Sequence, residues 1–301
     1  MNEALVGTTG STYPNLPQVL VHSGLIKAHA YSLWLDDRHS STGTILFGGV
    51  DAAKYHGTLK TVPIQPINGQ YAQFVIALTS VSMNAGSSKH RLAASSFPIG
   101  VLLDSGTSLT YLPPQVVTTI YNKLGAVYDG ARGIAFAPCS LVNQKIHFSF
   151  TFSAAQVHVS ITDLIRRWGG LQFQNGKHAC AFGIVPSTSG SFVLGDTFLR
   201  SADVVFDMDN NEISLANAKY NPSSNNILEI GTGTNAVPGA TRVPNPVTTV
   251  KPINPTGTVP TSVIAGDDSR SGSGTFSRER SSWRKLLFVP LLLVLLPFYN
   301  S

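Results

Sequence analysis

The sequence predicts an all-β protein, and three observations support this. Only 12% of its 301 residues are charged, while 27 are glycine and 18 are proline, which is typical of short strands joined by many turns. Apolar and polar residues alternate in several short runs, as they do in strands with one buried face. A single segment has a strong helical pattern. A chain of this length can fill one substantial domain with additional segments.

The first strands are expected near the N-terminus. Met1–Ala4 has neither the charged start nor the apolar core of a secretory signal peptide. Gln18–Lys27 predicts a short amphipathic helix that ends near Gly24. Tyr31–Leu35 alternates as a strand does, and Thr44–Gly49 predicts a second strand.

The middle of the chain is expected to hold most of the strands and the main helix. Tyr71–Val81 is an apolar, strand-like run, and alternation predicts half-buried strands at residues 146–152 and 157–161. The helix is predicted between Pro113 and Gly125, because proline favours the first helical turn, glycine favours the end, and apolar residues line one face between them.

Two histidines, His147 and His158, fall on the polar faces of the predicted strands. A metal centre needs cysteine, histidine or carboxylate side chains at ligand spacing, and the sequence contains no such cluster. We therefore expect both imidazoles to be solvated, and we expect neither a metal nor a cofactor.

The most informative stretch is a strand followed by an aspartate on a turn. Val101–Leu103 predicts a buried strand that delivers the carboxyl group of Asp104 onto a turn rich in hydroxyl groups. Gly106 allows a close approach of the backbone, and the neighbouring hydroxyls can hydrogen-bond a carboxylate. From the Asp-Ser-Gly residues alone, an ordinary Asx-turn at the end of a strand is the alternative.

Three segments resemble the pepsin-like aspartic protease family, in the order in which that family has them. Phe97–Pro113, which contains Val-Leu-Leu-Asp-Ser-Gly-Thr-Ser-Leu-Thr-Tyr-Leu-Pro, resembles the second active-site motif. Phe192–Arg200 resembles the apolar-apolar-Gly segment beside the catalytic loop, and Val204–Ala216 resembles the closing hairpin. Asp203 departs from the family, whose members usually carry a tyrosine there, and this puts the packing of the hairpin in doubt.

The first 65 residues resemble the end of the family's N-terminal lobe, and the fungal yapsin and candidapepsin branch matches best. The segments that carry the resemblance are Tyr-Pro-Asn-Leu-Pro-Gln, Gly-Leu-Ile-Lys, Ala-Tyr-Ser-Leu-Trp-Leu and Ile-Leu-Phe-Gly-Gly-Val-Asp-Ala-Ala-Lys-Tyr. The resemblance implies a pepsin-like bilobal fold. Residues 1–65 are then a remnant of the N-terminal lobe, most of which is missing, and residues 66–219 are a complete C-terminal catalytic lobe.

The resemblance also implies an aspartic-type endopeptidase that hydrolyses polypeptide substrates as a monomer. Members of the family hold one water between two aspartates, which share a proton because two carboxylates at such short range cannot both ionise. Asp104 is implied to be one of the two, with Thr107 hydrogen-bonded to its carboxylate. The other implied site residues are the loop residues Ser105, Gly106 and Ser108 and the loop-supporting residues Val193, Leu194 and Gly195.

The second catalytic aspartate is absent, because Asp-Ser/Thr-Gly occurs only at residues 104–106. The family's first motif, its flap tyrosine and its leader segments would precede this chain. We therefore expect the chain alone to be inactive and to derive from a truncated gene. The alternatives are a non-catalytic surface protein of the same family and a protease built from two identical halves, although the latter has no need of the lobe-one residues.

Cys139 and Cys180 are the only cysteines in the sequence. Their even number is weak evidence for a disulfide by itself, and two buried free thiols are the alternative. The resemblance implies a disulfide, because the C-terminal lobe of the family closes a loop with one in this region.

The formal charge of +5 does not indicate a nucleic-acid partner. Four basic residues and one acidic residue between Arg278 and Lys285 contribute +3 beside a C-terminal apolar run. No basic patch is interleaved with aromatic residues, as nucleic-acid binding would require.

The C-terminal part of the chain predicts a stalk and an anchor signal. Residues 220–270 are rich in Pro, Thr, Ser, Gly and Asn, which is typical of an unfolded linker. Residues 271–301 have the order of a glycosylphosphatidylinositol (GPI) attachment signal, with small residues, a polar basic spacer and an apolar run that is short for a membrane span. A tail-anchored helix is the alternative. GPI attachment predicts the outer plasma membrane or cell wall, with attachment at Ser273 or else at Ser271, Gly272 or Gly274.

Overall fold

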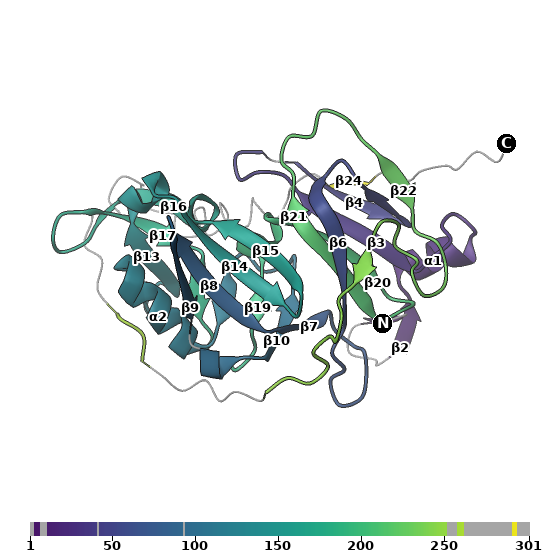
Figure 1. Cartoon of the computed structure of the whole chain (residues 1–301), viewed down its shortest axis with the longest axis horizontal. Helices are drawn as coiled ribbons and strands as arrows, with labels where there is room; N and C mark the ends of the chain where they lie inside the picture. The colour runs from purple at the N-terminus through teal and green to yellow at the C-terminus, as the bar shows by residue number, and fades with distance from the viewer. Residues whose placement is uncertain are drawn as a thin grey trace.

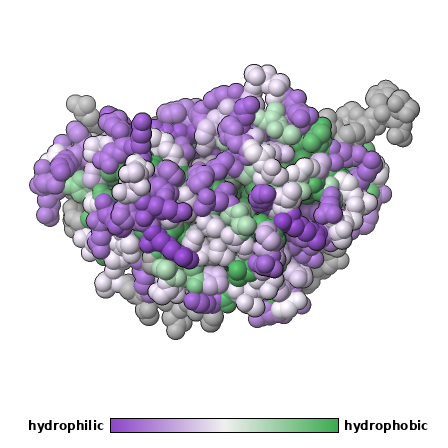
Figure 2. Space-filling model, viewed as in Figure 1, coloured by the Kyte–Doolittle hydropathy of each residue, from purple (hydrophilic) through white to green (hydrophobic). Residues whose placement is uncertain are grey.

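The computed structural model describes residues 3–6, 11–40, 42–92, 94–251, 258–261 and 291–293. Figure 1 shows two lobes side by side, one formed by teal strands from the middle of the chain and the other by purple and green strands from its earlier and later parts. Strands dominate both lobes, which confirms the all-β prediction. The face in Figure 2 is largely hydrophilic, with hydrophobic residues in small patches.

One lobe is built on a seven-stranded sheet that joins segments far apart in the sequence. Across this sheet the strands are β23 (Thr241–Arg242), β6 (Tyr55–Pro63), β21 (Glu212–Ala218), β20 (Ala202–Asp207), β3 (Ala30–Leu35), β4 (Gly43–Phe47) and β24 (Leu291–Leu293). Its smaller elements are the pair β1 (Glu3–Val6) and β2 (Ser11–Pro14), the pair β5 (Gly49–Asp51) and β22 (Ile227–Glu229), and helix α1 (Leu16–His22).

The other lobe contains three sheets around the largest apolar core. The five-stranded sheet has the order β18 (Ile184–Pro186), β11 (Thr110–Leu112), β19 (Val193–Leu194), β10 (Ile99–Leu103), β7 (Val75–Leu78). The four-stranded sheets are β12 (Val127–Asp129), β13 (Ile134–Pro138), β17 (His178–Phe182), β16 (Ile165–Gln172) and β15 (Ala155–Ser160), β14 (Ile146–Phe152), β8 (Ser80–Ala85), β9 (Ser88–Leu92). The helical segments are η1 (Ala94–Ser96), α2 (Pro114–Leu124), η2 (Cys139–Asn143), α3 (Ile161–Leu164) and α4 (Asp196–Leu199).

The elements with the clearest local patterns lie close to their predicted positions. Helix α2 begins at Pro114 and ends before Gly125, which has a φ of 65° in the left-handed region that glycine tolerates best. Strands β14 and β15 form an antiparallel hairpin with their alternate residues buried. Residues 71–74 are not part of a strand, and the predicted strand there is divided between β7 and β8.

The closing hairpin pairs with the first block of the chain. Strand β20 lies between β21 and β3, and β21 pairs in turn with β6. This pairing crosses the boundary at residue 65 that the sequence suggests. The pairing buries Ala30 and Leu33 of β3. On α1, however, Leu16 and Val19 remain 49% and 45% exposed. Strand pairing in the seven-stranded sheet thus stabilises residues 1–65, while the exposed face of α1 remains apolar.

Residues 221–251 are packed against both lobes, in contrast to the linker expected over residues 220–270. The side chains of Ile230, Val237 and Val243 are at most 6% exposed. The amide of Val247 donates a hydrogen bond of 2.9 Å to Ser153 Oγ in the other lobe, and Figure 1 shows this light green segment running from one lobe to the other. A few apolar side chains and backbone hydrogen bonds are enough to fix a segment whose overall composition is typical of disorder.

Asp203 is accommodated inside the seven-stranded sheet, and the hairpin has its full pairing. Its side chain is 1% exposed, and its Oδ1 has no hydrogen-bond partner within the described part of the chain. It faces a cavity of about 190 Å³ that Asp51 and Lys54 also line. Burial raises the pKa of Asp203 to about 8, Asp51 raises the pKa further, and Lys54 lowers it.

The protonation of Asp203 predicts a pH-dependent stability. An unfolded aspartate has a pKa near 3.9, so the folded state binds the extra proton and its stability falls between about pH 4 and pH 8. Asp203→Asn cannot ionise, and we expect it to be about 1–3 kcal/mol more stable than the wild type at pH 7. Urea midpoints at pH 5 and pH 8 measure this, with Glu229→Gln, which removes a surface ion pair to the exposed Lys27, as the control. An unchanged pH dependence in Asp203→Asn would contradict the assignment.

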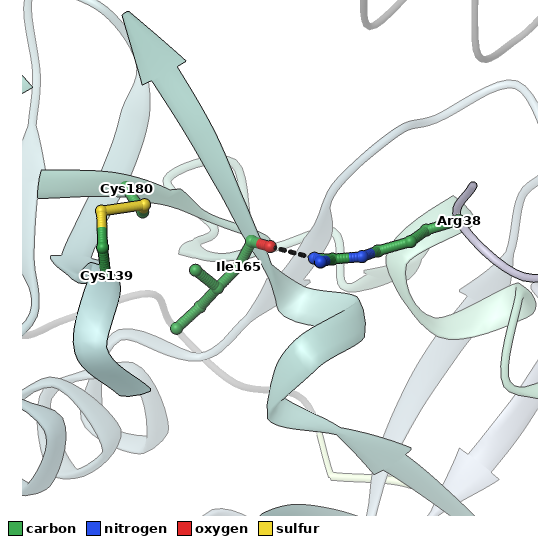
Figure 3. The surroundings of a disulfide bond; sticks show 4 residues. All are labelled: Arg38, Cys139, Ile165 and Cys180. Carbon is green, nitrogen blue, oxygen red and sulfur yellow. Dashed lines mark hydrogen bonds between the residues drawn. A yellow bond between two sulfur atoms is a disulfide. The ribbon is translucent and has the colours of Figure 1, made fainter. Parts of the chain in front are cut away.

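Cys139 and Cys180 form a disulfide, which confirms the pairing that the family resemblance implies. It joins η2 to β17 across a sequence separation of 41 residues, with Cα atoms 5.0 Å apart (Figure 3). A crosslink of this span restricts the unfolded chain more than the folded one.

Removal of this disulfide should destabilise the larger apolar core. In the chain-entropy model, a closed loop of about 40 residues contributes about 3–4 kcal/mol. The double variant Cys139→Ala/Cys180→Ala is therefore expected to unfold at a clearly lower urea concentration. Reduced wild-type protein serves as the matched comparison, and equal midpoints for the oxidised wild type and the double variant would contradict the prediction.

The anchor prediction falls largely outside the described residues. Ser271, Gly272, Ser273 and Gly274 are among the residues that the structure does not describe, and of the apolar run only β24 is described. No helix in the described ranges is long and apolar enough to cross a membrane.

Candidate active site

Strand β10 is an inner strand of the five-stranded sheet, and Asp104 follows its last residue. It pairs in parallel with β19 and antiparallel with β7, so both of its edges are covered. The amide of Asp104 donates a hydrogen bond of 3.2 Å to the carbonyl of Leu194. Three buried residues of the strand, Ile99, Val101 and Leu103, face the core. The strand therefore ends with a half-buried carboxyl group at a position set by two neighbouring strands.

The turn after the strand holds the carboxylate of Asp104 on both of its oxygens. The amide of Gly106 donates to Oδ1 at 2.9 Å, and the hydroxyl of Thr107 donates to Oδ2 at 2.6 Å. The amide of Thr107 also donates to the carbonyl of Asp104 at 3.3 Å. The structure thus contains the Asx-turn of the simpler interpretation, and within it the hydroxyl contact to Thr107 that the family resemblance implies.

Glycine is suited to position 106 because the turn is tight. A Cβ atom on Gly106 would lie 3.1 Å from Asp104 Oδ1, so a side chain would press on the carboxylate. The preceding residue, Ser105, is exposed and borders a cavity of about 390 Å³. Tyr31, Phe74 and Phe206 form the aromatic wall of this cavity, with the rings of Tyr31 and Phe206 stacked at 4.8 Å.

The segment from Val193 to Gly195 supports the turn at Asp104 through the backbone. A Cβ atom on Gly195 would lie 2.2 Å from the carbonyl oxygen of Thr107 and 2.5 Å from that of Leu109, distances that no side chain can adopt. Immediately after this glycine, the amide of Asp196 donates to the Thr107 carbonyl at 2.8 Å. The amide of Thr197 donates to the Ser108 carbonyl at 3.1 Å. Gly195 therefore permits two strands' ends to approach closely enough for these hydrogen bonds.

Asp196 lies beside this turn as well, and no local pattern predicts a role for it. Its side chain is 7% exposed. Burial raises the pKa of Asp196 to about 6, the charge of Asp104 raises it as well, and the guanidinium of Arg200 lowers it. The spacing of four residues between Asp196 and Arg200 is the only local signal that could have indicated an electrostatic pair.

The side chains around Asp104 are suited to acid–base chemistry by a carboxylate. Within the described residues no group of three or more His, Cys, Asp or Glu side chains could hold a metal ion. His147 and His158 are exposed, as expected. A fixed carboxylate with one hydroxyl and one amide donor can instead orient and deprotonate a water, provided that a second acid acts on the carbonyl being attacked.

Comparisons with known proteins agree with this chemistry. The family described as "Eukaryotic aspartyl protease" matches residues 3–218. The probable aspartic-type endopeptidase opsB of Aspergillus oryzae is 55% identical over 83% of this chain and 52% of its own length. The aspartic proteinase yapsin-3 of Saccharomyces cerevisiae is 36% identical over 80% of this chain and 46% of its own length.

A solved structure shows the same fold. The aspartic proteinase from Irpex lacteus matches with a TM-score of 0.55 and 22% identity, over 72% of this chain and 65% of that one. The chain spans about half the length of the curated relatives that it matches.

Proposed function

Because the chain belongs to the eukaryotic aspartyl protease family, we propose that Asp104 supplies one of the two carboxylates of a peptide-hydrolysing site. The observation that carries this proposal is the geometry at the end of β10. There the Gly106 amide and the Thr107 hydroxyl hold the two oxygens of a half-buried carboxylate. The close approach of Gly195 to the carbonyls of Thr107 and Leu109 supports the same turn.

The proposed reaction is hydrolysis of a polypeptide by water activated between two aspartates. The two carboxylates share one proton, because both cannot be ionised at short range. The ionised carboxylate accepts a proton from water as the water oxygen attacks the peptide carbonyl carbon. The protonated carboxyl donates its proton towards the carbonyl oxygen, which gives a neutral tetrahedral diol. In the second step the C–N bond breaks: the carboxyl that took the proton from water gives it to the leaving nitrogen, and the other carboxylate takes a proton from a diol hydroxyl. The products are a carboxylic acid and an amine, and the carboxyl pair again shares one proton. This sequence of steps needs no covalent intermediate with the enzyme.

The second aspartate is proposed to come from polypeptide outside these 301 residues. Asp-Ser/Thr-Gly occurs once in the chain, at residues 104–106. The relatives that the chain resembles are about twice as long as the region that it matches. We therefore propose that the chain is one part of an aspartic-type endopeptidase and is inactive alone.

A fusion protein tests this function. The half of the Aspergillus oryzae relative that this chain does not match would be joined to the N-terminus of the chain. The expected result is hydrolysis of a denatured polypeptide at acidic pH that pepstatin inhibits. A folded fusion protein without activity would instead favour the alternative, a surface protein of the same family that lacks catalysis.

We also propose that the full-length protein is held at the outer plasma membrane or the cell wall by a GPI anchor. The order of small residues, spacer and apolar run in residues 271–301 supports this. Attachment at Ser273 would remove the remaining tail, including β24. Phosphatidylinositol-specific phospholipase should release the protein from cells. Protein that remains membrane-bound and retains Leu286–Tyr299 by mass spectrometry would identify a transmembrane anchor.

A further inference from the structure

One sheet in the lobe of Asp104 has an exposed face whose described residues include no carboxylate. It is the four-stranded sheet of β15, β14, β8 and β9, which lie side by side in Figure 1. No Asp or Glu occurs at residues 66–103 or 130–162, and these ranges include all four strands. The inner face of the sheet belongs to the apolar core, with Val81 and Phe148 fully buried. The side chains of the outer face alternate with these along each strand.

Four basic side chains of the outer face are exposed: Lys89, Arg91, His147 and His158. The strand register places them in two neighbouring rows across the sheet. Lys89 and His147 flank Asn84 in the first row, because both lie opposite it. Arg91 and His158 are at the two ends of the second row, with two serines between them. Adjacent strands lie about 4.8 Å apart, so the four basic groups share a face about 15 Å wide.

Hydrogen bonds fix the centre of this face. Asn84 Nδ2 donates to Ser149 Oγ at 3.0 Å, and a hydrogen bond of 2.8 Å joins Ser149 Oγ to His158 Nδ1. Ser149 itself is only 2% exposed, because the larger side chains around it close over the hydroxyl. The ring of His147 lies edge-on to that of His158, with the ring centroids 5.5 Å apart. Both imidazoles therefore have defined positions on the face.

The other outward side chains are polar and uncharged, among them Ser82, Thr151, Gln156 and Ser160. His90 of β9 alternates to the other side of its strand. Within these four strands, no apolar side chain or aromatic ring belongs to the outer face. An interfacial membrane contact buries apolar side chains, and stacking on a nucleic-acid base needs aromatic rings. The face is therefore suited to a partner that it recognises by negative charge and by hydrogen bonds.

We infer that this face binds an acidic segment of another polypeptide. Carboxylates spaced along an extended chain match the two rows of basic groups, and the guanidinium of Arg91 can hold one carboxylate through two parallel N–H donors. The hydroxyl and amide groups between the basic residues can bond the backbone of the segment. The face shares no residue with the site around Asp104, so the binding is independent of the proposed hydrolysis.

Mild acidification should strengthen the binding, because protonation of the two imidazoles adds positive charge. Burial lowers the pKa of His158, and the charges of His147 and Lys89 lower it further, so neighbouring carboxylates would favour its protonated form. The carboxyl groups of Asp and Glu, with ordinary pKa values near 3.9 and 4.3, remain ionised at pH 5.5 and are largely neutral at pH 3.5. Binding should therefore be strongest near pH 5.5 and weaker at both pH 7.5 and pH 3.5.

Charged groups on the neighbouring elements favour the same pH dependence. Lys123 lies on α2, which packs against β9, and His56 and Lys60 lie on β6, which contacts β15. Asp163 of α3 follows β15, and burial raises its pKa, so it loses its negative charge on acidification. Glu212 of β21 forms an ion pair of 2.9 Å with an arginine of β23. Acidification thus makes the surroundings of the face more positive.

Fluorescence anisotropy with a labelled oligo-aspartate peptide tests the inference on the 301-residue chain. The matched control peptide has Asn in place of each Asp and should not bind. We expect the aspartate peptide to bind about threefold or more tightly at pH 5.5 than at pH 7.5, and high salt should weaken binding because exposed charges are screened. The folded fusion protein should bind in the same way, because the proposed face remains open when the other half is present.

Substitutions locate the binding on the sheet. The double variant Lys89→Gln/Arg91→Gln should weaken binding at pH 5.5 by about fivefold or more. His147→Gln/His158→Gln should bind equally at pH 5.5 and pH 7.5, because the titrating groups are gone. Lys177→Gln removes one exposed charge from the turn between β16 and β17, in a different sheet, and should bind as the wild type does.

Three results would overturn the inference. The first is equal affinity of the Lys89→Gln/Arg91→Gln, Lys177→Gln and wild-type chains, because the binding would then not involve this face. The second is binding by the chain but not by the folded fusion protein, which would show that the missing half covers the face. The third is binding of phosphatidylserine vesicles without binding of the peptide, which would identify a membrane surface as the partner.

Discussion

Asp104→Asn is expected to abolish peptide hydrolysis by the fusion protein described above. The amide has nearly the same shape as the carboxyl group but can neither accept the proton of the attacking water nor share a proton with a second aspartate. We expect kcat/KM to fall by about 10³-fold or more. In the wild type, the backbone N–H of Gly106 donates to Asp104 Oδ1 at 2.9 Å. The side-chain oxygen of asparagine can accept the same hydrogen bond, so the unfolding temperature should change little.

Thr107 provides a graded control for this prediction. Thr107→Ser retains the hydroxyl that donates to Asp104 Oδ2, whereas Thr107→Val removes it. The serine variant should retain most activity, and the valine variant should lose an intermediate part of it. Asp209→Asn, at an exposed carboxylate, should have no effect. Substantial activity in Asp104→Asn would remove Asp104 from the catalytic pair.

Among the glycine-to-alanine substitutions in the described part of the chain, Gly195→Ala is expected to destabilise the fold most. Its Cβ atom would lie within 2.5 Å of the carbonyl oxygens of Thr107 and Leu109, and both contacts are with backbone rather than with a side chain that could move away. Relief of these contacts requires separation of β19 from the turn at Asp104. We expect a loss of about 3 kcal/mol or more, together with loss of activity in the fusion protein.

Gly170→Ala is the matched control for this substitution. No atom lies within 4 Å of a Cβ built on Gly170, and the residue is exposed on β16. Its free energy of unfolding, measured with urea, should stay within about 0.5 kcal/mol of the wild-type value. If Gly195→Ala unfolds at the same urea concentration as Gly170→Ala, the close approach at Gly195 does not hold the site together.

Local patterns in the sequence were sufficient to predict helix α2, the hairpin of β14 and β15, and the turn at Asp104. Helix α2 has its own start and stop signals in Pro114 and Gly125. Strand β10 ends at Leu103, just before Asp104, because an apolar run is followed by residues that favour a turn. The contacts of the Asp104 carboxylate are made within three residues of it, so the turn specifies them without help from distant parts of the chain.

The arrangement of the elements could not be predicted in the same way. The pairing of β20 with β3 joins residues about 170 positions apart, and alternation in either strand says nothing about its partner. Residues 221–251 have the composition of a disordered segment, yet the few apolar side chains among them, such as Ile230, are buried on the lobe. The cavity that Arg38, Arg166 and Arg200 line draws its residues from several elements, so no spacing in the sequence indicates it.

The most direct test of a site shared between two different halves is an assay of the 301-residue chain alone. Hydrolysis of a polypeptide substrate at acidic pH would be measured over a wide range of chain concentrations, with and without pepstatin, beside the fusion protein. We predict no pepstatin-sensitive hydrolysis by the chain at any concentration and clear hydrolysis by the fusion protein. Pepstatin-sensitive activity of the chain alone would contradict this, and a rise with the square of its concentration would show that two copies of Asp104 form the catalytic pair.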